Sequence, residues 1–241
     1  MILAWLAFLP RATRSMVRAP FDQTRVILTR LLLSSLPVVV VTAAASAAML
    51  TVQAAVSLYI VGGGPLAGML VSLGGVREVF PLLAIASLAA RSGAEFASEL
   101  GSMKVDQQID AIDVMGLDSI RLLVGPRVLA ATIGGPICVI FADGSGLIGS
   151  YLVGALQLGI DRGSLEAALV DAVGLSDLLV GVLKGVVLGW LVGVITTFEG
   201  LQARGGARGV GVATNRAVVL SMILVCGTSL IMTWLFYGQA K

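Results

Sequence analysis

Two long stretches of the chain carry no charge at all. Neither Leu31–Val76 nor Ala217–Gly238 contains Asp, Glu, Lys or Arg. A bilayer is crossed by about 20 apolar residues in a helix, because a helix satisfies its own backbone hydrogen bonds within lipid. These stretches therefore predict an all-α integral membrane protein.

The overall composition points the same way. Charged residues make up 12% and hydrophobic residues 57%, whereas soluble domains carry about 25% charged residues. The net charge of +2 is too small to indicate a nucleic-acid partner. The chain has no histidine, the commonest general base and metal ligand, so we expect neither an enzyme nor a metal site.

Five membrane spans account for the apolar runs. We place them at about Leu36–Val61, Leu66–Ala90, Val128–Leu156, Leu178–Phe198 and Ala217–Gly238. Gly62-Gly63-Gly64-Pro65 predicts a tight turn between the first two spans, and Gly134-Gly135-Pro136 predicts a break in the third.

The first ten residues, Met1–Pro10, are apolar but do not resemble a signal peptide. A signal peptide carries its positive charges before the apolar run, whereas here Arg11, Arg14 and Arg18 follow it. We expect an amphipathic segment at the membrane interface, with Trp5 and Phe8 facing lipid and the arginines facing anionic headgroups.

The basic residues define a topology. Residues 1–30, 91–127 and 199–216 together hold 12 of the 16 Lys and Arg residues. Only Arg162 and Lys241 fall on the other side of the predicted membrane. Because basic loops stay in the cytoplasm, we expect a cytoplasmic N-terminus and a C-terminus outside.

The segment from Arg91 to Arg127 holds 10 of the chain's charged residues between the second and third spans. Asp106, Asp110 and Asp113, spaced i, i+4, i+7, predict an acidic stripe on one helix face. Gly101-Ser102 predicts a break in this helical segment, with Ser102 as an N-cap. The pattern fits either a solvated loop helix or a helix that docks on a cytoplasmic partner. The length and position of the segment favour docking.

Several charges fall within or beside the spans. Arg77 and Glu78 lie in the second span, and Lys184 follows Asp177 by two helical turns in the fourth. Intramembrane charges are costly and indicate function, but an ion pair with a structural role, or a Lys184 side chain that reaches to the surface, remains an alternative. We expect Asp143, beside Gly144 and Gly146, to cap a broken helix.

Four glycines, Gly181, Gly185, Gly189 and Gly193, share one face of the fourth span. Such a face lets another helix approach closely, either in a dimer or bundle seam or in ordinary intramolecular packing.

No Gly-Lys pair exists, so a Walker A loop is absent. If the protein moves a substrate against its concentration gradient, another subunit supplies the energy.

Four sequence motifs are shared with a known family. Residues 90–105 read ARSGAEFASELGSMKV, residues 108–116 read QIDAIDVMG, residues 126–130 read PRVLA, and residues 209–219 read GVGVATNRAVV. This pattern resembles the Mla/Mce-type (YrbE-like) permeases, the membrane subunits of ABC lipid transporters.

The resemblance implies an architecture and partners. It implies one permease domain over residues 1–241, with an interfacial segment at 1–35, a five-span bundle at 36–238 and a cytoplasmic coupling helix at about 92–117. Two permease subunits, identical or paralogous, would pair in a bacterial inner membrane. A cytoplasmic ATPase would bind ATP and Mg²⁺, with no cofactor in this chain, and an Mce-domain protein on the outer side would exchange lipid.

The resemblance also implies roles for particular residues. The lipid cavity would be formed or supported by Arg77, Glu78, Asp177 and Lys184. The residues that couple to the ATPase would be Glu95, Glu99, Lys104, Asp106, Asp110 and Asp113. The chain departs from the family at Phe80, where relatives often have glycine, and Asp143 has no obvious equivalent.

Two other functions compete with a lipid permease. A secondary transporter or channel would use Arg77, Glu78, Asp143 and Lys184 as an ion or proton relay. A scaffold would anchor an Mce protein without transporting lipid. Co-purification of an ATPase, and stimulation of ATP hydrolysis by lipid, separate these possibilities from a permease.

Overall fold

The computed structural model describes residues 2–59 and 66–238, with side chains from residue 8 onward. Within these ranges every regular element is helical and strands are absent, so the all-α prediction is confirmed. The tight turn predicted at Gly62–Pro65 lies outside the described residues.

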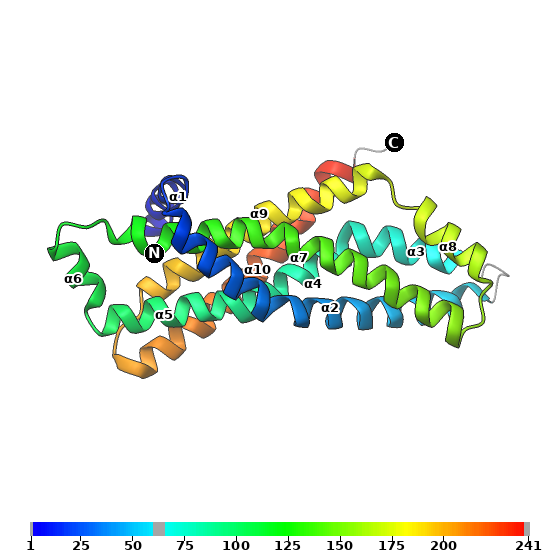
Figure 1. Ribbon diagram of the computed structural model, residues 1–241, viewed down its shortest axis with the longest axis horizontal. Helices are drawn as coiled ribbons and strands as arrows, with labels where there is room; N and C mark the ends of the chain where they lie inside the picture. The colour runs from blue at the N-terminus through cyan, green and yellow to red at the C-terminus, as the bar shows by residue number, and fades with distance from the viewer. Residues whose placement is uncertain (1, 60–65, 239–241) are drawn as a thin grey trace. The chain divides into compact units, whose positions relative to one another are not determined.

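The helices follow one another with short connections (Figure 1). In chain order they are α1 (Ile2–Val17), α2 (Phe21–Tyr59), α3 (Leu66–Gly74), η1 (Gly75–Val79), α4 (Phe80–Leu88), η2 (Ala89–Gly93), α5 (Ala94–Val105), α6 (Gln108–Val114), η3 (Ile120–Val124), α7 (Gly125–Leu152), η4 (Val153–Gln157), α8 (Arg162–Asp171), α9 (Leu175–Leu201) and α10 (Gly206–Tyr237).

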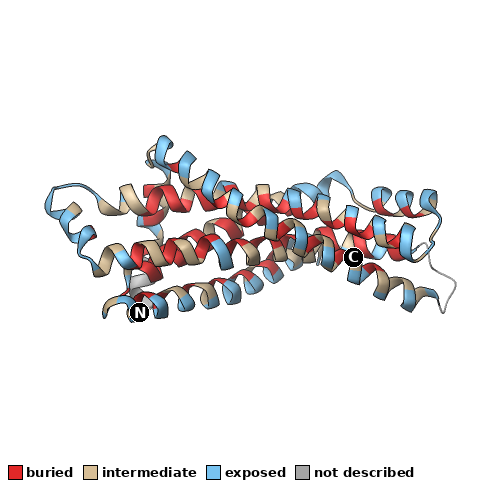
Figure 2. Ribbon diagram, turned by 60° about the horizontal axis from the view of Figure 1, so that its bottom comes forward, coloured by how far each residue is buried: buried red, intermediate tan, exposed pale blue. Residues whose placement is uncertain are grey.

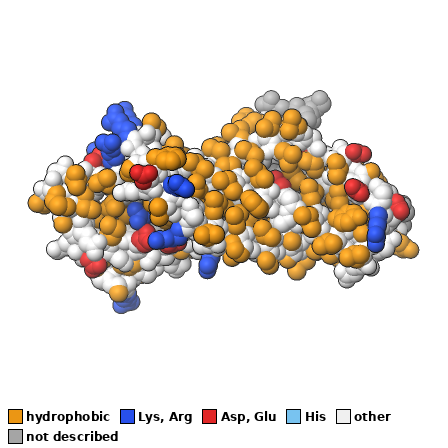
Figure 3. Space-filling view, in the orientation of Figure 1, with side chains coloured by type: hydrophobic (Ala, Val, Ile, Leu, Met, Phe, Trp, Pro, Cys, Tyr) orange, Lys and Arg blue, Asp and Glu red, His pale blue; other side chains and the backbone are white. Residues whose placement is uncertain are grey.

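Five helical stretches of the described chain are long and apolar enough to cross a membrane. They are Phe21–Tyr59, Leu66–Val105, Ile120–Gln157, Leu175–Leu201 and Gly206–Tyr237. Their number and order agree with the five predicted spans, and each contains most of the corresponding span. Hydrophobic side chains cover much of the face seen in Figure 3, as expected for a surface in contact with lipid.

Irregular turns occur in two of these long helices: η1 and η2 interrupt Leu66–Val105 without breaking it, and η3 and η4 form the two ends of Ile120–Gln157. The elements η1 to η4 are single π-helical turns of five residues each, a form that occurs mostly as bulges inside α-helices, often at functional sites. The predicted break at Gly134-Gly135-Pro136 is wrong, because α7 continues through Pro136. Membrane helices tolerate proline where neighbouring helices and local adjustments satisfy the freed backbone group.

The chain forms two compact units, and the long helices contribute to both. Unit 1 comprises Met1–Ser35, Ile85–Gly135 and Val186–Thr228, and unit 2 comprises Leu36–Ala84, Pro136–Gly185 and Ser229–Lys241. Buried residues run in stripes along the long helices (Figure 2). The prediction of a single permease domain stays a prediction.

The N-terminal helix packs into the core of unit 1. Phe8 and Ala12 are buried in a cluster with Val124, Val128 and other apolar residues. The ring centroid of Phe8 lies 5.2 Å from that of Phe198. The expectation that Phe8 faces lipid is therefore wrong, because α9 offers an aromatic partner that the local sequence pattern did not reveal.

Glycines bring α9 against α7. In unit 1, a Cβ atom at Gly189 would collide with the carbonyl oxygen of Ala131, and one at Gly193 would lie 3.0 Å from the Cα of Val128. In unit 2, a Cβ at Gly181 would meet Val139 at 3.7 Å. Gly189 and Gly193 therefore serve intramolecular packing, one of the two roles considered for this face, whereas a methyl group at Gly181 would make only ordinary contacts.

Unit 2 also contains close helix contacts. The hydroxyl groups of Thr51 and Ser150 lie 2.7 Å apart and join α2 to α7. The buried ring of Phe80 occupies space left by two glycines, since a Cβ at Gly75 or Gly146 would lie 2.5 or 2.7 Å from its ring atoms. Phe80 thus fills space in the packed interior.

Candidate functional site

A cluster of polar side chains lies within the apolar helices of unit 2. Two members lie on η1, two on α9 and three on α10. We call this the polar cluster; it consists of Arg77, Glu78, Asp177, Lys184, Ser229, Thr233 and Tyr237. All four residues predicted for a lipid cavity belong to it.

Arg77 and Asp177 form a bidentate ion pair. The Nε atom of Arg77 lies 2.9 Å from Oδ1 of Asp177, and Nη2 lies 3.2 Å from Oδ2. The Tyr237 hydroxyl donates to the same carboxylate at 3.0 Å, and the Arg77 guanidinium lies 4.6 Å from the centre of the tyrosine ring. Paired hydrogen bonds and the cation–π contact fix the orientation of the guanidinium.

Lys184 forms the second ion pair of the cluster. Its Nζ atom lies 2.6 Å from a carboxylate oxygen of Glu78, 2.6 Å from the carbonyl oxygen of Arg77 and 2.7 Å from the hydroxyl of Thr233. The Thr233 and Ser229 hydroxyls also donate to Glu78. Because Lys184 is completely buried, the alternative in which it reaches the surface is wrong.

The two cations differ in what they can still bind. All three ammonium protons of Lys184 have acceptors within the cluster. The Arg77 side chain is 37% exposed, and its contacts with described residues use Nε and Nη2 and leave Nη1 available. Arg77 is therefore the member of the cluster that can meet an anionic ligand, while Lys184 holds the backbone and Glu78 in place.

The sequence interpretation missed the three members on α10. Ser229, Thr233 and Tyr237 are spaced i, i+4, i+8, which places their polar groups on one face of an apolar helix. That spacing was the available signal. A hydroxyl in a membrane helix can bond a carbonyl of its own preceding turn, as Thr233 does with the Ser229 carbonyl at 2.9 Å. Because such a local bond can satisfy the hydroxyl, composition alone did not reveal the contacts with distant segments.

Asp143 has a different setting from the one predicted. It lies inside α7 and caps no helix end, because the expected break does not occur. Its side chain is buried, and Oδ1 has no hydrogen-bond partner among the described residues.

The described residues also contain no group of three or more His, Cys, Asp and Glu side chains that could hold a metal ion.

The charged segment of unit 1 folds as two helices, α5 and α6, that meet at Gln107. This residue has a left-handed backbone with φ of 59°, and Figure 1 shows α6 turned away from the direction of α5. The predicted break at Gly101-Ser102 is wrong because α5 continues to Val105. A Cβ at Gly101 would lie only 3.2 Å from that of Ala203, so this glycine permits close packing.

The shift of the break changes the predicted acidic stripe. Asp106 is the C-cap of α5, whereas Asp110 and Asp113 lie on α6, so the three carboxylates do not share one helix face. Lys104 reaches across the junction and lies 2.7 Å from Asp110. Asp113 remains exposed.

The two glutamates of α5 pair within the chain. Glu99 lies 3.0 Å from Arg30 and 2.8 Å from Arg127, and Glu95 lies 3.5 Å from Arg30. These contacts hold α5 against α2 and α7. They favour a structural role for both glutamates over a direct role in coupling.

The end of α6 carries exposed apolar side chains. Val114 is 88% exposed and Met115 is 67% exposed, and Leu117 is also exposed. Soluble surfaces rarely gather large apolar side chains in this way unless another protein or a membrane covers them. We refer to Val114, Met115 and Leu117 as the apolar tip of α6.

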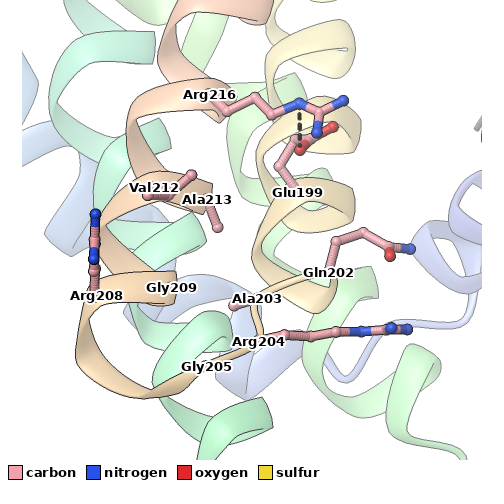
Figure 4. A pocket seen from close by; sticks show the side chains of 10 residues that line it. All are labelled: Glu199, Gln202, Ala203, Arg204, Gly205, Arg208, Gly209, Val212, Ala213 and Arg216. Atoms are coloured by element: carbon pink, nitrogen blue, oxygen red, sulfur yellow. Dashed lines mark ion pairs between the residues drawn. The ribbon is translucent and has the colours of Figure 1, made fainter.

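A pocket of about 340 Å³ lies at the turn between α9 and α10, also in unit 1. Buried Glu199 pairs with Arg216 at 3.3 Å beside it, while Arg204 and Arg208 extend away from this pair (Figure 4). Ala203 of the same turn and Val210 of α10 pack beside Val105 of α5. The turn thus supports the helix that leads into α6.

Comparison with known proteins identifies the family. The family described as "Permease MlaE" matches residues 27–235. The chain belongs to the MlaE permease family. This confirms the resemblance drawn from the four motifs.

Similar proteins occur in distant organisms. A probable ABC transporter permease protein of Rickettsia bellii is 34% identical over 228 residues, which cover 94% of this chain and 88% of the relative. The intermembrane phospholipid transport system permease protein MlaE of Haemophilus influenzae is 32% identical over 71% of this chain and 66% of its own length. The chloroplast protein TRIGALACTOSYLDIACYLGLYCEROL 1 of Arabidopsis thaliana is 31% identical over 70% of this chain and 50% of the relative.

Membership in this family defines the general role of the chain. It is a transporter subunit rather than an enzyme. Together with the five apolar helical stretches, the family makes it a multi-pass protein of the inner membrane.

Proposed function

We propose that this chain is the permease subunit of an ABC transporter that moves phospholipid between the inner membrane and an Mce-domain protein on the outer side. A separate cytoplasmic ATPase binds ATP and Mg²⁺ and drives the movement. The family and the Haemophilus relative, named for intermembrane phospholipid transport, support this proposal.

The observation that carries the proposal is the state of Arg77 in the polar cluster. Its guanidinium is held by Asp177 and Tyr237 but remains partly exposed with donors available. Arginine binds phosphate through paired, charge-assisted hydrogen bonds. A phospholipid headgroup would therefore meet Arg77, while its tails lie against apolar side chains. Lys184 and Glu78 would support this site without touching the lipid.

The apolar tip of α6 is the proposed contact with the ATPase. Val114 and Met115 would enter a groove on the partner, and exposed Asp113 would contribute charge at its rim. Apolar anchors in the centre of an interface supply most of the binding energy, whereas rim charges mainly affect association rate and specificity. This assignment moves the main coupling role from the predicted acidic stripe to the end of α6.

The proposed topology keeps the N-terminus in the cytoplasm and the C-terminus outside. Residues 1–30, 91–127 and 199–216, which carry most of the basic side chains, all belong to unit 1. Such grouping agrees with one cytoplasmic side.

We further propose pairing with a second permease subunit, identical or paralogous, since α10 exposes large apolar residues such as Ile223 and Ile231.

The lipid site can be tested by changing Arg77 to Gln. Arg162→Gln is the matched control, because it removes the same charge from an exposed position of unit 2. Each variant is purified with its partner subunits, and bound phospholipid is measured by mass spectrometry. We expect bound phospholipid to fall about tenfold in Arg77→Gln, as for loss of one strong charge-assisted contact, while the control keeps it.

The alternatives make different predictions in the same preparation. If the complex assembles and Arg77→Gln retains its phospholipid, Arg77 is not the headgroup ligand. A secondary transporter would purify without an ATPase and would move its substrate without ATP. A scaffold would show no stimulation of ATP hydrolysis by lipid.

A further inference from the structure

Four arginines surround a second pocket, in unit 1 and separate in sequence from the polar cluster. The pocket has a volume of about 440 Å³. Arg11, Arg14 and Arg18 line it from α1 and the turn after it, and Arg121 lines it from η3. The remaining lining residues are Ser15, Asp118 and Ile120.

Packing and hydrogen bonds fix the walls of this pocket. Phe8 and Ala12 anchor α1 in the core of unit 1. The Nε atom of Arg121 donates to the carbonyl oxygen of Arg18 at 3.1 Å and so ties η3 to the end of α1. A Cβ at Gly125 would lie 2.6 Å from the Ser15 carbonyl oxygen, so glycine permits this close approach. The arginines are therefore gathered by the fold and do not merely happen to lie on a mobile tail.

The charges in the pocket are not balanced within the described part of the chain. None of the four arginines forms an ion pair there. Asp118 is the one carboxylate lining the pocket, and its Oδ1 accepts a hydrogen bond from the backbone N–H of Arg121. Like charges held close together repel, and an anion placed between them relieves that repulsion.

The surroundings of the pocket identify the source of the anion. Val17 and Phe21 flank Arg18 in sequence, and both side chains are largely exposed. A cationic cluster next to exposed apolar side chains is typical of a segment at the membrane interface. A free phosphate ion would have no use for the apolar neighbours, whereas a phospholipid would occupy both surfaces.

We propose that this pocket binds the headgroup of an anionic phospholipid resident in the leaflet beside α1. The phosphate lies among the four guanidinium groups, and the acyl chains lie along Val17 and Phe21. This lipid is distinct from the transported lipid at Arg77. By joining α1 to Arg121, which follows α6 in the chain, it steadies the segment that leads from the coupling helix into α7.

The test uses the full chain with Arg77→Gln, so that binding at the transport site does not contribute. The probes are mixed micelles that contain phosphatidylglycerol or zwitterionic phosphatidylcholine, and inorganic phosphate alone. Lipid occupancy is read by native mass spectrometry and the thermal midpoint by unfolding. The test variant adds Arg14→Gln and Arg121→Gln. The matched control adds Arg25→Gln and Arg208→Gln, which remove the same charge from exposed positions of unit 1 outside this pocket.

Phosphatidylglycerol should bind and raise the thermal midpoint in the parent and in the control, with phosphatidylcholine much weaker. The test variant should lose at least about tenfold in affinity for phosphatidylglycerol, as for loss of two charge-assisted contacts. An Arg14→Lys, Arg121→Lys variant should keep part of the binding. That variant also serves as the test if the Gln variant fails to fold.

Three outcomes would overturn the proposal. Equal binding of phosphatidylglycerol in the test and control variants would remove the role of the pocket. Inorganic phosphate that matched the effect of the lipid would identify a free-phosphate site. Co-purification of the ATPase with the same variants is measured in parallel, and its loss with unchanged lipid binding would show that the surface is a protein interface. Because Arg77 is absent throughout, none of these results depends on the proposed transport site.

Discussion

The ammonium group of Lys184 lies 2.6 Å from Glu78, and the lysine is fully buried while the glutamate side chain is 36% exposed. This asymmetry predicts unequal effects of removing either partner. Glu78→Gln leaves a buried cation with neutral acceptors and should destabilise the fold by about 3–5 kcal/mol. Lys184→Met should cost less, because Glu78 keeps partial exposure and the hydroxyls of Ser229 and Thr233.

The measurement is thermal unfolding of the purified protein, with the double variant Glu78→Gln, Lys184→Met completing a thermodynamic cycle. We expect the double variant to recover much of the stability lost in Glu78→Gln. A larger loss in Lys184→Met than in Glu78→Gln would contradict the structural assignment of this pair.

The apolar tip of α6 predicts sensitivity of ATPase association to polar substitution. Met115→Glu should weaken association strongly, since it buries a charge in an interface, and Asp113→Lys should weaken it less. Co-purification of the ATPase and its dissociation rate are measured. Asp171→Lys, an exposed change on α8, serves as the control. Unaltered association of folded Met115→Glu would assign the contact to another surface.

The contact of α9 with α7 predicts a clash on adding one methyl group. Gly189→Ala should destabilise the protein by about 1–3 kcal/mol, because the methyl group would meet the backbone of Ala131 and not a flexible side chain. Gly227→Ala is the control, since nothing lies within 4 Å of a Cβ at that position. Similar thermal midpoints for the two variants would refute tight packing at Gly189.

Asp143 predicts a stabilising substitution. A buried ionisable carboxyl group that forms no ion pair with a described residue is costly in a membrane helix, and Asp143→Asn removes the capacity for charge while preserving shape. We expect a higher thermal midpoint with unchanged lipid transport. Asp171→Asn, at an exposed site, should leave the midpoint unchanged. Higher stability accompanied by loss of transport would instead assign Asp143 to the transport mechanism.

The topology predicts which cysteines an impermeant reagent can label. With Cys138 and Cys226 replaced by Ala, Glu166→Cys should react in intact cells, and Arg208→Cys should react only after permeabilisation. Both parent residues are exposed, so access rather than burial decides the outcome. The reverse pattern would invert the proposed orientation.

Sequence reasoning predicted the helical class, the five spans and four of the seven members of the polar cluster. Charged side chains in apolar surroundings require polar partners. The structure brings four such side chains together, those of Arg77, Glu78, Asp177 and Lys184. Contacts between distant segments could not be predicted in this way. Tyr237 reaches Asp177 across 60 positions, and no local rule joins them.

The helix break in the charged segment shows a second limit. Glycine and serine favour the end of a helix in general, yet tertiary packing against Ala203 explains Gly101, and α5 continues through it. The turn occurs instead at Gln107, whose residue type does not favour a positive φ. Only the arrangement of α5, α6 and their neighbours determines that position.

The π-helical turns affect how this chain should be aligned with its relatives. A π turn closes its hydrogen bonds over five residues where an α turn uses four, so it accommodates one additional residue in a continuous helix. A relative whose second span differs only by an α-helical turn in place of η2 (Ala89–Gly93) would need a one-residue gap there. Alignment that forbids gaps within spans would then pair every residue on one side of η2 with the wrong position, about 100° around the helix.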